Sequence, residues 1–105
     1  MQHNLGLIEA IPLGEGREYT VDGTPIAVFR LRSGAVCATQ ASCPHQEAPL
    51  CDGITGGTTL ICPFHAWKFD LTTGEAILGN SGLKTYPVET HTDGTISVAV
   101  DNAVK

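Results

Sequence analysis

The sequence carries little charge and no long apolar run. Only 16% of its 105 residues are Asp, Glu, Lys or Arg, and 11 acidic residues against 6 basic ones give a net charge of −5. Nucleic acids and anionic membrane surfaces attract basic faces, so this balance argues against both as partners. No apolar stretch approaches the roughly 20 residues that a transmembrane helix needs, so no membrane association is expected.

Targeting and nucleotide-binding signals are also missing. The N-terminus lacks a basic segment followed by an apolar one, so a signal peptide is not indicated and a cytoplasmic location is expected. Thiols stay reduced there, and the four cysteines are expected to be ligands or buried thiols rather than a disulfide framework. No G-x-G-x-x-G fingerprint is present, so no flavin or nicotinamide site is expected.

No window holds a helical period long enough to predict a helix, whereas turn signals such as Asp22-Gly23, Thr73-Gly74 and Asp93-Gly94 separate short β-rich runs. The pattern predicts a single all-β domain over residues 1–105, built as a β-sandwich or small barrel. In the last run, Ile96 and Val98 are expected to point one way and Ser97 the other. We expect strands at residues 5–10, 18–21, 26–31, 35–40, 58–62, 66–71, 85–90 and 95–100.

Two segments, 41–55 and 77–83, are predicted to be long loops, and loops of this length in a small domain are usually functional. The first holds Cys43 and His45, and Cys62 and His65 follow after sixteen intervening residues. Two thiolates and two imidazoles could bind one zinc ion, although zinc sites usually pair cysteines as C-x2–4-C. They could equally hold a 2Fe–2S cluster in which two histidines replace two cysteines.

The C-x-H-x16-C-x2-H spacing, with AWKFDLTTGE after Pro63-Phe64-His65, is similar to the signature of the Rieske family, and the likeness extends over about residues 26–100. The resemblance implies a Rieske-like antiparallel β-sandwich with a cluster-binding part of two loops at about 41–70. It implies one Rieske-type 2Fe–2S cluster. Cys43 and Cys62 would bind the buried iron, and His45 and His65 the outer iron.

The resemblance also bears on the reduction potential. Rieske proteins of respiratory complexes join the two loops by a disulfide and direct Ser and Tyr hydroxyls at sulfur. In this sequence the two disulfide positions are Ala48 and Phe64, so that bridge cannot form. The Ser and Tyr positions are Trp67 and Phe69, which have no hydroxyl. The resemblance therefore implies the low-potential, ferredoxin-like branch of the family.

The function implied is electron transfer without catalysis, since an oxygenase iron needs a 2-His-1-carboxylate triad and only His3 and His91 are left. One branch of the family is the ferredoxin that passes electrons from a flavin-dependent NAD(P)H reductase to a terminal oxygenase. The alternative is the small subunit of an NAD(P)H-dependent nitrite reductase. A third hypothesis is a binding module that a zinc ion holds together and that has no redox role. The docking face is expected around His45 and His65, with Gln46, Glu47, Pro49 and Leu50 beside them.

Overall fold

The computed structural model describes residues 2–42, 49–62, 67–78 and 82–99, and these form eleven short strands and two 3-10 turns. The elements in chain order are β1 (Gln2–Leu7), η1 (Ile8–Ala10), β2 (Gly16–Val21), β3 (Thr24–Arg30), β4 (Val36–Gln40), η2 (Leu50–Asp52), β5 (Ile54–Gly56), β6 (Thr59–Ile61), β7 (Lys68–Asp70), β8 (Ala76–Leu78), β9 (Thr85–Tyr86), β10 (Val88–Thr90) and β11 (Thr95–Ala99).

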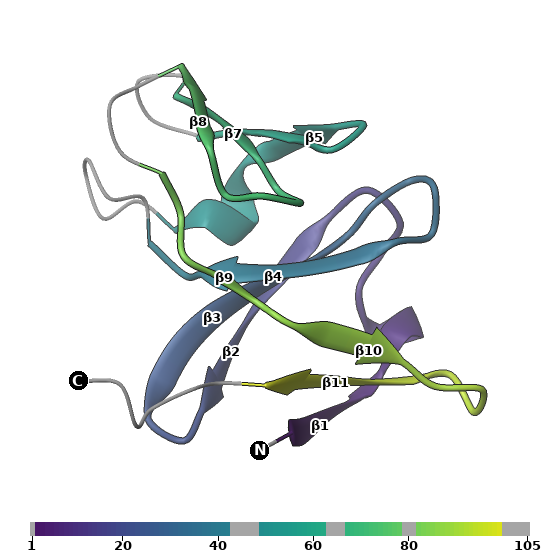
Figure 1. Ribbon diagram of the computed structural model, residues 1–105. Helices are drawn as coiled ribbons and strands as arrows, with labels where there is room; N and C mark the ends of the chain where they lie inside the picture. The colour runs from purple at the N-terminus through teal and green to yellow at the C-terminus, as the bar shows by residue number, and fades with distance from the viewer. Residues whose placement is uncertain (1, 43–48, 63–66, 79–81, 100–105) are drawn as a thin grey trace.

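The strands form three antiparallel sheets, with orders β1-β11-β10, β2-β3-β4-β9 and β5-β6-β7-β8. Figure 1 shows the β5–β8 sheet and η2 at one end of the molecule, and β1 and β11 at the other. The predicted all-β antiparallel fold is confirmed. Among the described residues, no helix has the length and apolar character that crossing a bilayer requires.

One strand expected at residues 85–90 is divided at Pro87 into β9 and β10. β9 pairs with β4, and β10 pairs with β11, so the chain passes from one sheet to another at this point. Proline has no backbone N–H and cannot donate to a continuous ladder. The Pro87 carbonyl still accepts the Ala99 N–H at 2.9 Å, which holds the crossing against β11.

Strand β3 is buried on both faces and separates two apolar cores. Its side chains alternate between the two cores, as the two-residue period of a strand requires. We call the first the loop-side core; it contains Ala27, Phe29, Leu31, Leu50, Leu60, Cys62, Phe69, Leu71 and Leu83. The second, the far core, contains Ile11, Val21, Ile26, Val28, Ala38, Ile96 and Val98.

Several predicted boundaries were wrong. Residues 8–10 form η1 rather than strand, because the Ile11 N–H bonds back to the Ile8 carbonyl at 3.0 Å. β5 begins inside the predicted 41–55 loop, where it pairs with β6. β8 extends into the predicted 77–83 loop, where it pairs with β7.

The burial of Ser97 does not follow from the alternation, which predicts only the direction of its side chain. Ile96 and Val98 are fully buried as expected, but Ser97 is also only 6% exposed. Its hydroxyl lies 2.8 Å from Nε2 of His91, so the polar group is hydrogen-bonded within the protein. A short polar side chain with such a partner can be buried at little cost.

Candidate metal centre

The two segments that carry the predicted ligands are closed at their bases. Ser42 and Pro49 form an isolated antiparallel bridge, and the Leu50 N–H donates to the Ala41 carbonyl at 2.9 Å. The Cys62 N–H donates to the Trp67 carbonyl at 2.7 Å. Backbone pairing therefore fixes where each segment leaves and rejoins the fold.

Of the four predicted ligands, Cys62 lies within the described residues, whereas Cys43, His45 and His65 lie outside them. Cys62 follows β6 directly, is 2% exposed and belongs to the loop-side core. Burying a thiolate in apolar surroundings is costly unless it is paired or coordinates a metal. This position therefore fits a sulfur ligand on the inner side of a metal centre.

The bases of the two segments share the loop-side core. Leu50, which follows the first segment, and Cys62, which precedes the second, both belong to it. Trp67 packs against the same core, with its ring centroid 6.3 Å from that of the fully buried Phe69. The bases of both segments are thus joined by an apolar layer, and such a layer limits solvent access to a metal centre.

Leu50 is fully buried, so its prediction as part of the docking face was wrong. Leu50 is the first residue of the 3-10 turn η2, and its side chain packs in the loop-side core. Pro49, one residue earlier, is exposed, in keeping with a place on the docking face. The neighbouring Gln46 and Glu47 lie outside the described residues.

Two other cysteines are described and neither is in a disulfide. Cys37 is half-buried against the loop-side core, and its burial, followed by the charge of Asp70, raises the pKa of its thiol. Burial also raises the pKa of the Cys51 thiol, with smaller contributions from Asp52 and Glu18. Protonated thiols are poor ligands and nucleophiles, so both fit the expectation of buried thiols rather than of ligands.

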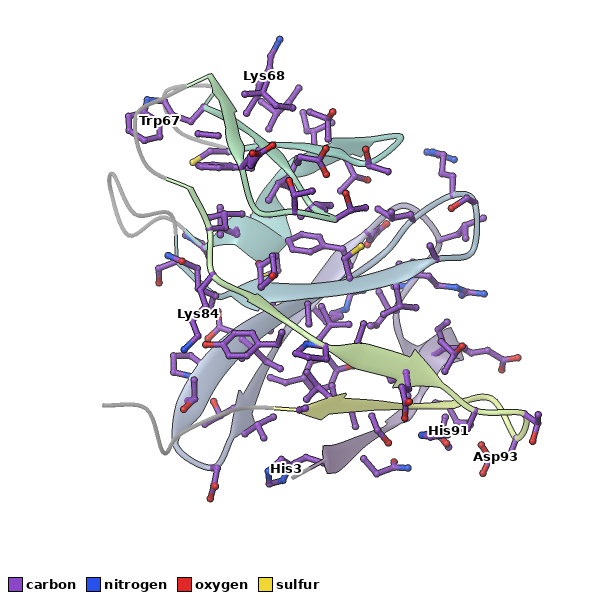
Figure 2. The ribbon with its side chains drawn as sticks, in the orientation of Figure 1. His3, Trp67, Lys68, Lys84, His91 and Asp93 are labelled. Carbon is purple, nitrogen blue, oxygen red and sulfur yellow. The ribbon has the colours of Figure 1, made fainter. Side chains whose placement is uncertain are left out.

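The two histidines outside the motif are far from this end of the molecule. Figure 2 shows Trp67 and Lys68 at one end, and His3, His91 and Asp93 at the opposite end. His91 is exposed and its ring bonds to Ser97. Neither histidine can therefore join a centre formed beside Cys62.

Gln40 is a residue that the sequence analysis missed. Its side-chain amide bonds to the backbone of Ser42 and to that of Lys84, each at 2.8 Å. It thereby connects the start of the first ligand segment to the chain that follows the 77–83 region. No motif marks it, and its position three residues before Cys43 is the only signal in the sequence.

The family pattern described as the Rieske [2Fe-2S] domain matches residues 3–87. The ferredoxin component of the naphthalene 1,2-dioxygenase system of Pseudomonas aeruginosa is 36% identical over 81 residues, covering 75% of this chain and 77% of that protein. Much longer proteins match as well. The 4beta-methylsterol monooxygenase of Methylococcus capsulatus is 36% identical over 64% of this chain, but the match spans only 21% of its length.

Solved structures share the fold. A chain in the complex of reduced oxygenase and oxidized ferredoxin of carbazole 1,9a-dioxygenase superimposes with a TM-score of 0.82 and 28% identity, covering 92% of this chain and all of that one. A putative NADH-dependent nitrite reductase small subunit from Mycobacterium tuberculosis gives 0.89 with 24% identity, covering 98% and 97%, a likeness of fold alone. The resemblance inferred from the sequence is confirmed. This chain belongs to the Rieske [2Fe-2S] domain family, and its cofactor is one Rieske-type 2Fe–2S cluster.

Proposed function

We propose that Cys43, His45, Cys62 and His65 hold the cluster of this protein and that it works as an electron-carrying ferredoxin. In this proposal residues 1–105 form one cluster-binding domain. Its electrons come from a flavin-dependent NAD(P)H reductase in the cytoplasm and go to a terminal oxygenase. The observation that carries the proposal is the match to a ferredoxin component over three-quarters of both chains.

The ligand assignment is supported by the one predicted ligand that is described. Cys62 is buried at the base of a closed loop, where a metal partner would stabilise a thiolate. Among the described residues, no group of three His, Cys, Asp or Glu side chains could hold a metal ion. The other three residues of the motif lie in 43–48 and 63–66, outside the described residues.

When bound, the cluster accepts and donates single electrons, and the protein fixes its position and surroundings. Leu50, Trp67 and Phe69 form an apolar layer at the bases of the two ligand segments, and this layer would keep water from the inner side of the cluster. The exposed Pro49 and the half-exposed Trp67 flank the segments. Both belong to the surface that would approach a redox partner, and short distances favour electron transfer.

The role of carrier rather than catalyst is supported by the names of the relatives, which are ferredoxin components of dioxygenase systems. The oxygenase partner is supported by the solved complex of oxygenase and ferredoxin, whose fold this chain shares. The alternative partner, a nitrite reductase large subunit, is supported only by likeness of fold. We therefore propose a terminal oxygenase, rather than a nitrite reductase large subunit, as the electron acceptor.

Reconstitution tests the proposed partner. The purified protein, reduced by an NADH-dependent flavin reductase, is mixed with the terminal oxygenase of a naphthalene dioxygenase system, and naphthalene oxidation is followed. We expect turnover that depends on this protein and is lost in Cys62→Ser. Turnover only with a nitrite reductase large subunit, measured as nitrite loss, would favour the alternative and reject the proposed partner.

A further inference from the structure

Gln40 makes three hydrogen bonds that join two segments distant in sequence. Its Nε2 donates to the Ser42 carbonyl at 2.8 Å, and its Oε1 accepts the Lys84 N–H at 2.8 Å. Its own backbone N–H donates to the Lys84 carbonyl at 2.9 Å. Because one partner can only accept and the other can only donate, the orientation of the amide group is fixed.

The first bond acts on the chain that enters the first ligand segment. The Ser42 carbonyl belongs to the peptide group that links Ser42 to Cys43. Ser42 is also held by its bridge to Pro49 at the other end of the segment. The side chain of Gln40 therefore restrains the peptide plane from which the proposed ligand Cys43 begins.

The second and third bonds are made to the backbone of Lys84, which follows Leu83. The Leu83 N–H donates to the Gly74 carbonyl at 2.6 Å, and Leu83 is buried in the loop-side core. Lys84, labelled on the left of Figure 2, is then tied to Gln40 on both of its backbone groups. Gln40 therefore connects the start of the first ligand segment to Lys84, whose neighbour Leu83 is anchored in the loop-side core.

The side-chain bond of Gln40 to Ser42 is partly buried, whereas its side-chain bond to Lys84 is exposed. Gln40 is half-buried at the end of β4, next to Ala41, which is only 4% exposed. Removing one partner of a shielded hydrogen bond leaves the other partner unsatisfied, which costs more than the bond itself contributes. Outer groups that orient ligands typically change metal affinity by about 10- to 100-fold when they are lost.

We propose that Gln40 is a positioning residue for the cluster, acting through the Ser42–Cys43 peptide. The proposal rests on the proposed ligand set, in which Cys43 is a ligand. It predicts that the Ser42 bond matters for cluster retention, and that the Lys84 bond alone does not replace it. Nothing in this role requires Gln40 to touch the cluster or a redox partner.

Two variants separate the bonds. Gln40→Met keeps the length of the side chain but removes both side-chain bonds. Gln40→Glu keeps an acceptor for the Lys84 N–H but places a second acceptor opposite the Ser42 carbonyl. The matched control is Thr55→Val, which removes a side-chain bond to the Gly14 carbonyl, also 2.8 Å long, elsewhere in the fold.

The measurements are the rate at which a chelator bleaches the oxidised protein and the EPR spectrum of the reduced protein. We expect about tenfold faster bleaching and an altered EPR line shape in both Gln40 variants, and neither change in Thr55→Val. If Gln40→Met does not fold, Gln40→Glu decides alone. The proposal would be overturned if Gln40→Glu had the bleaching rate and EPR spectrum of wild type. It would also be overturned if both Gln40 variants behaved like the control Thr55→Val.

The ligand set is tested separately by Cys43→Ser. Loss of the native cluster in this variant together with wild-type behaviour in the Gln40 variants would reject the role of Gln40 and leave the proposed function standing. A native cluster in Cys43→Ser would reject the ligand set, and the proposed role of Gln40 with it.

Discussion

Replacing Leu50 by Ala tests whether the apolar layer at the base of the first ligand segment stabilises the protein. Leu50 is fully buried, and its side chain enters the loop-side core together with Cys62 and Phe69. Its N–H also closes the segment by bonding to the Ala41 carbonyl. The substitution removes apolar contacts while leaving this backbone bond in place, so the effect isolates packing.

The size of the effect follows from complete burial. Buried Leu→Ala substitutions cost about 2–5 kcal/mol in the free energy of unfolding, the higher values arising where a cavity remains. For a domain of this size, about 1 kcal/mol lowers the melting temperature by roughly 4–8 °C. A central cost of about 3 kcal/mol therefore corresponds to a drop of roughly 12–24 °C. We expect faster loss of the cluster to a chelator as well.

The assay is thermal unfolding followed by circular dichroism, with bleaching at 25 °C followed in parallel. Leu13→Ala is the matched control, because Leu13 is the same residue type and is 47% exposed. It should cost less than about 1 kcal/mol and leave bleaching unchanged. Equal melting temperatures for Leu50→Ala and Leu13→Ala would refute the argument that Leu50 supports the segment.

Three further outcomes are expected. Cys37→Ser and Cys51→Ser should keep the visible spectrum of wild type, and bleaching by either would require a new ligand assignment. The midpoint potential should lie near or below roughly −100 mV, at the lower end of the Rieske range, and Trp67→Ser with Phe69→Tyr should raise it; voltammetry showing a wild-type midpoint well above zero would contradict this. The pKa of Asp70 is held below its usual value, first by the hydroxyl and then by the N–H of Thr72. The ionised carboxylate therefore stabilises the fold at neutral pH, and this stabilisation is lost as the pH falls below about 4. Asp70→Asn should weaken the dependence of unfolding on pH in that acidic range.

The sequence was sufficient for the all-β class and for the family, because both depend on local patterns. Turn dipeptides punctuate the chain, and the four-ligand spacing needs no knowledge of tertiary structure. Strand ends were less predictable. Residues 76–78 carry no clear alternation, and they form β8 because β7 offers a pairing edge at Phe69.

Side-chain environments were harder still, because they depend on contacts between distant segments. The alternation predicts that Ser97 points away from Ile96, but it does not predict that Ser97 is buried and hydrogen-bonded to the ring of His91. Leu50 was expected on the surface beside the ligands, yet η2 directs it into the core. The bonds of Gln40 reach across 44 residues to Lys84, which no local pattern reveals.

The central claim is that two of the four histidines, His45 and His65, bind the cluster. Pulsed EPR of the reduced protein, with histidine labelled by nitrogen-15, measures this directly. The account predicts two strongly coupled histidine nitrogens, which persist when His3 and His91 are replaced by Gln and fall to one in His65→Cys if the cluster is retained. A spectrum with no histidine nitrogen coupled to the cluster, or a coupling lost in His91→Gln, would contradict it.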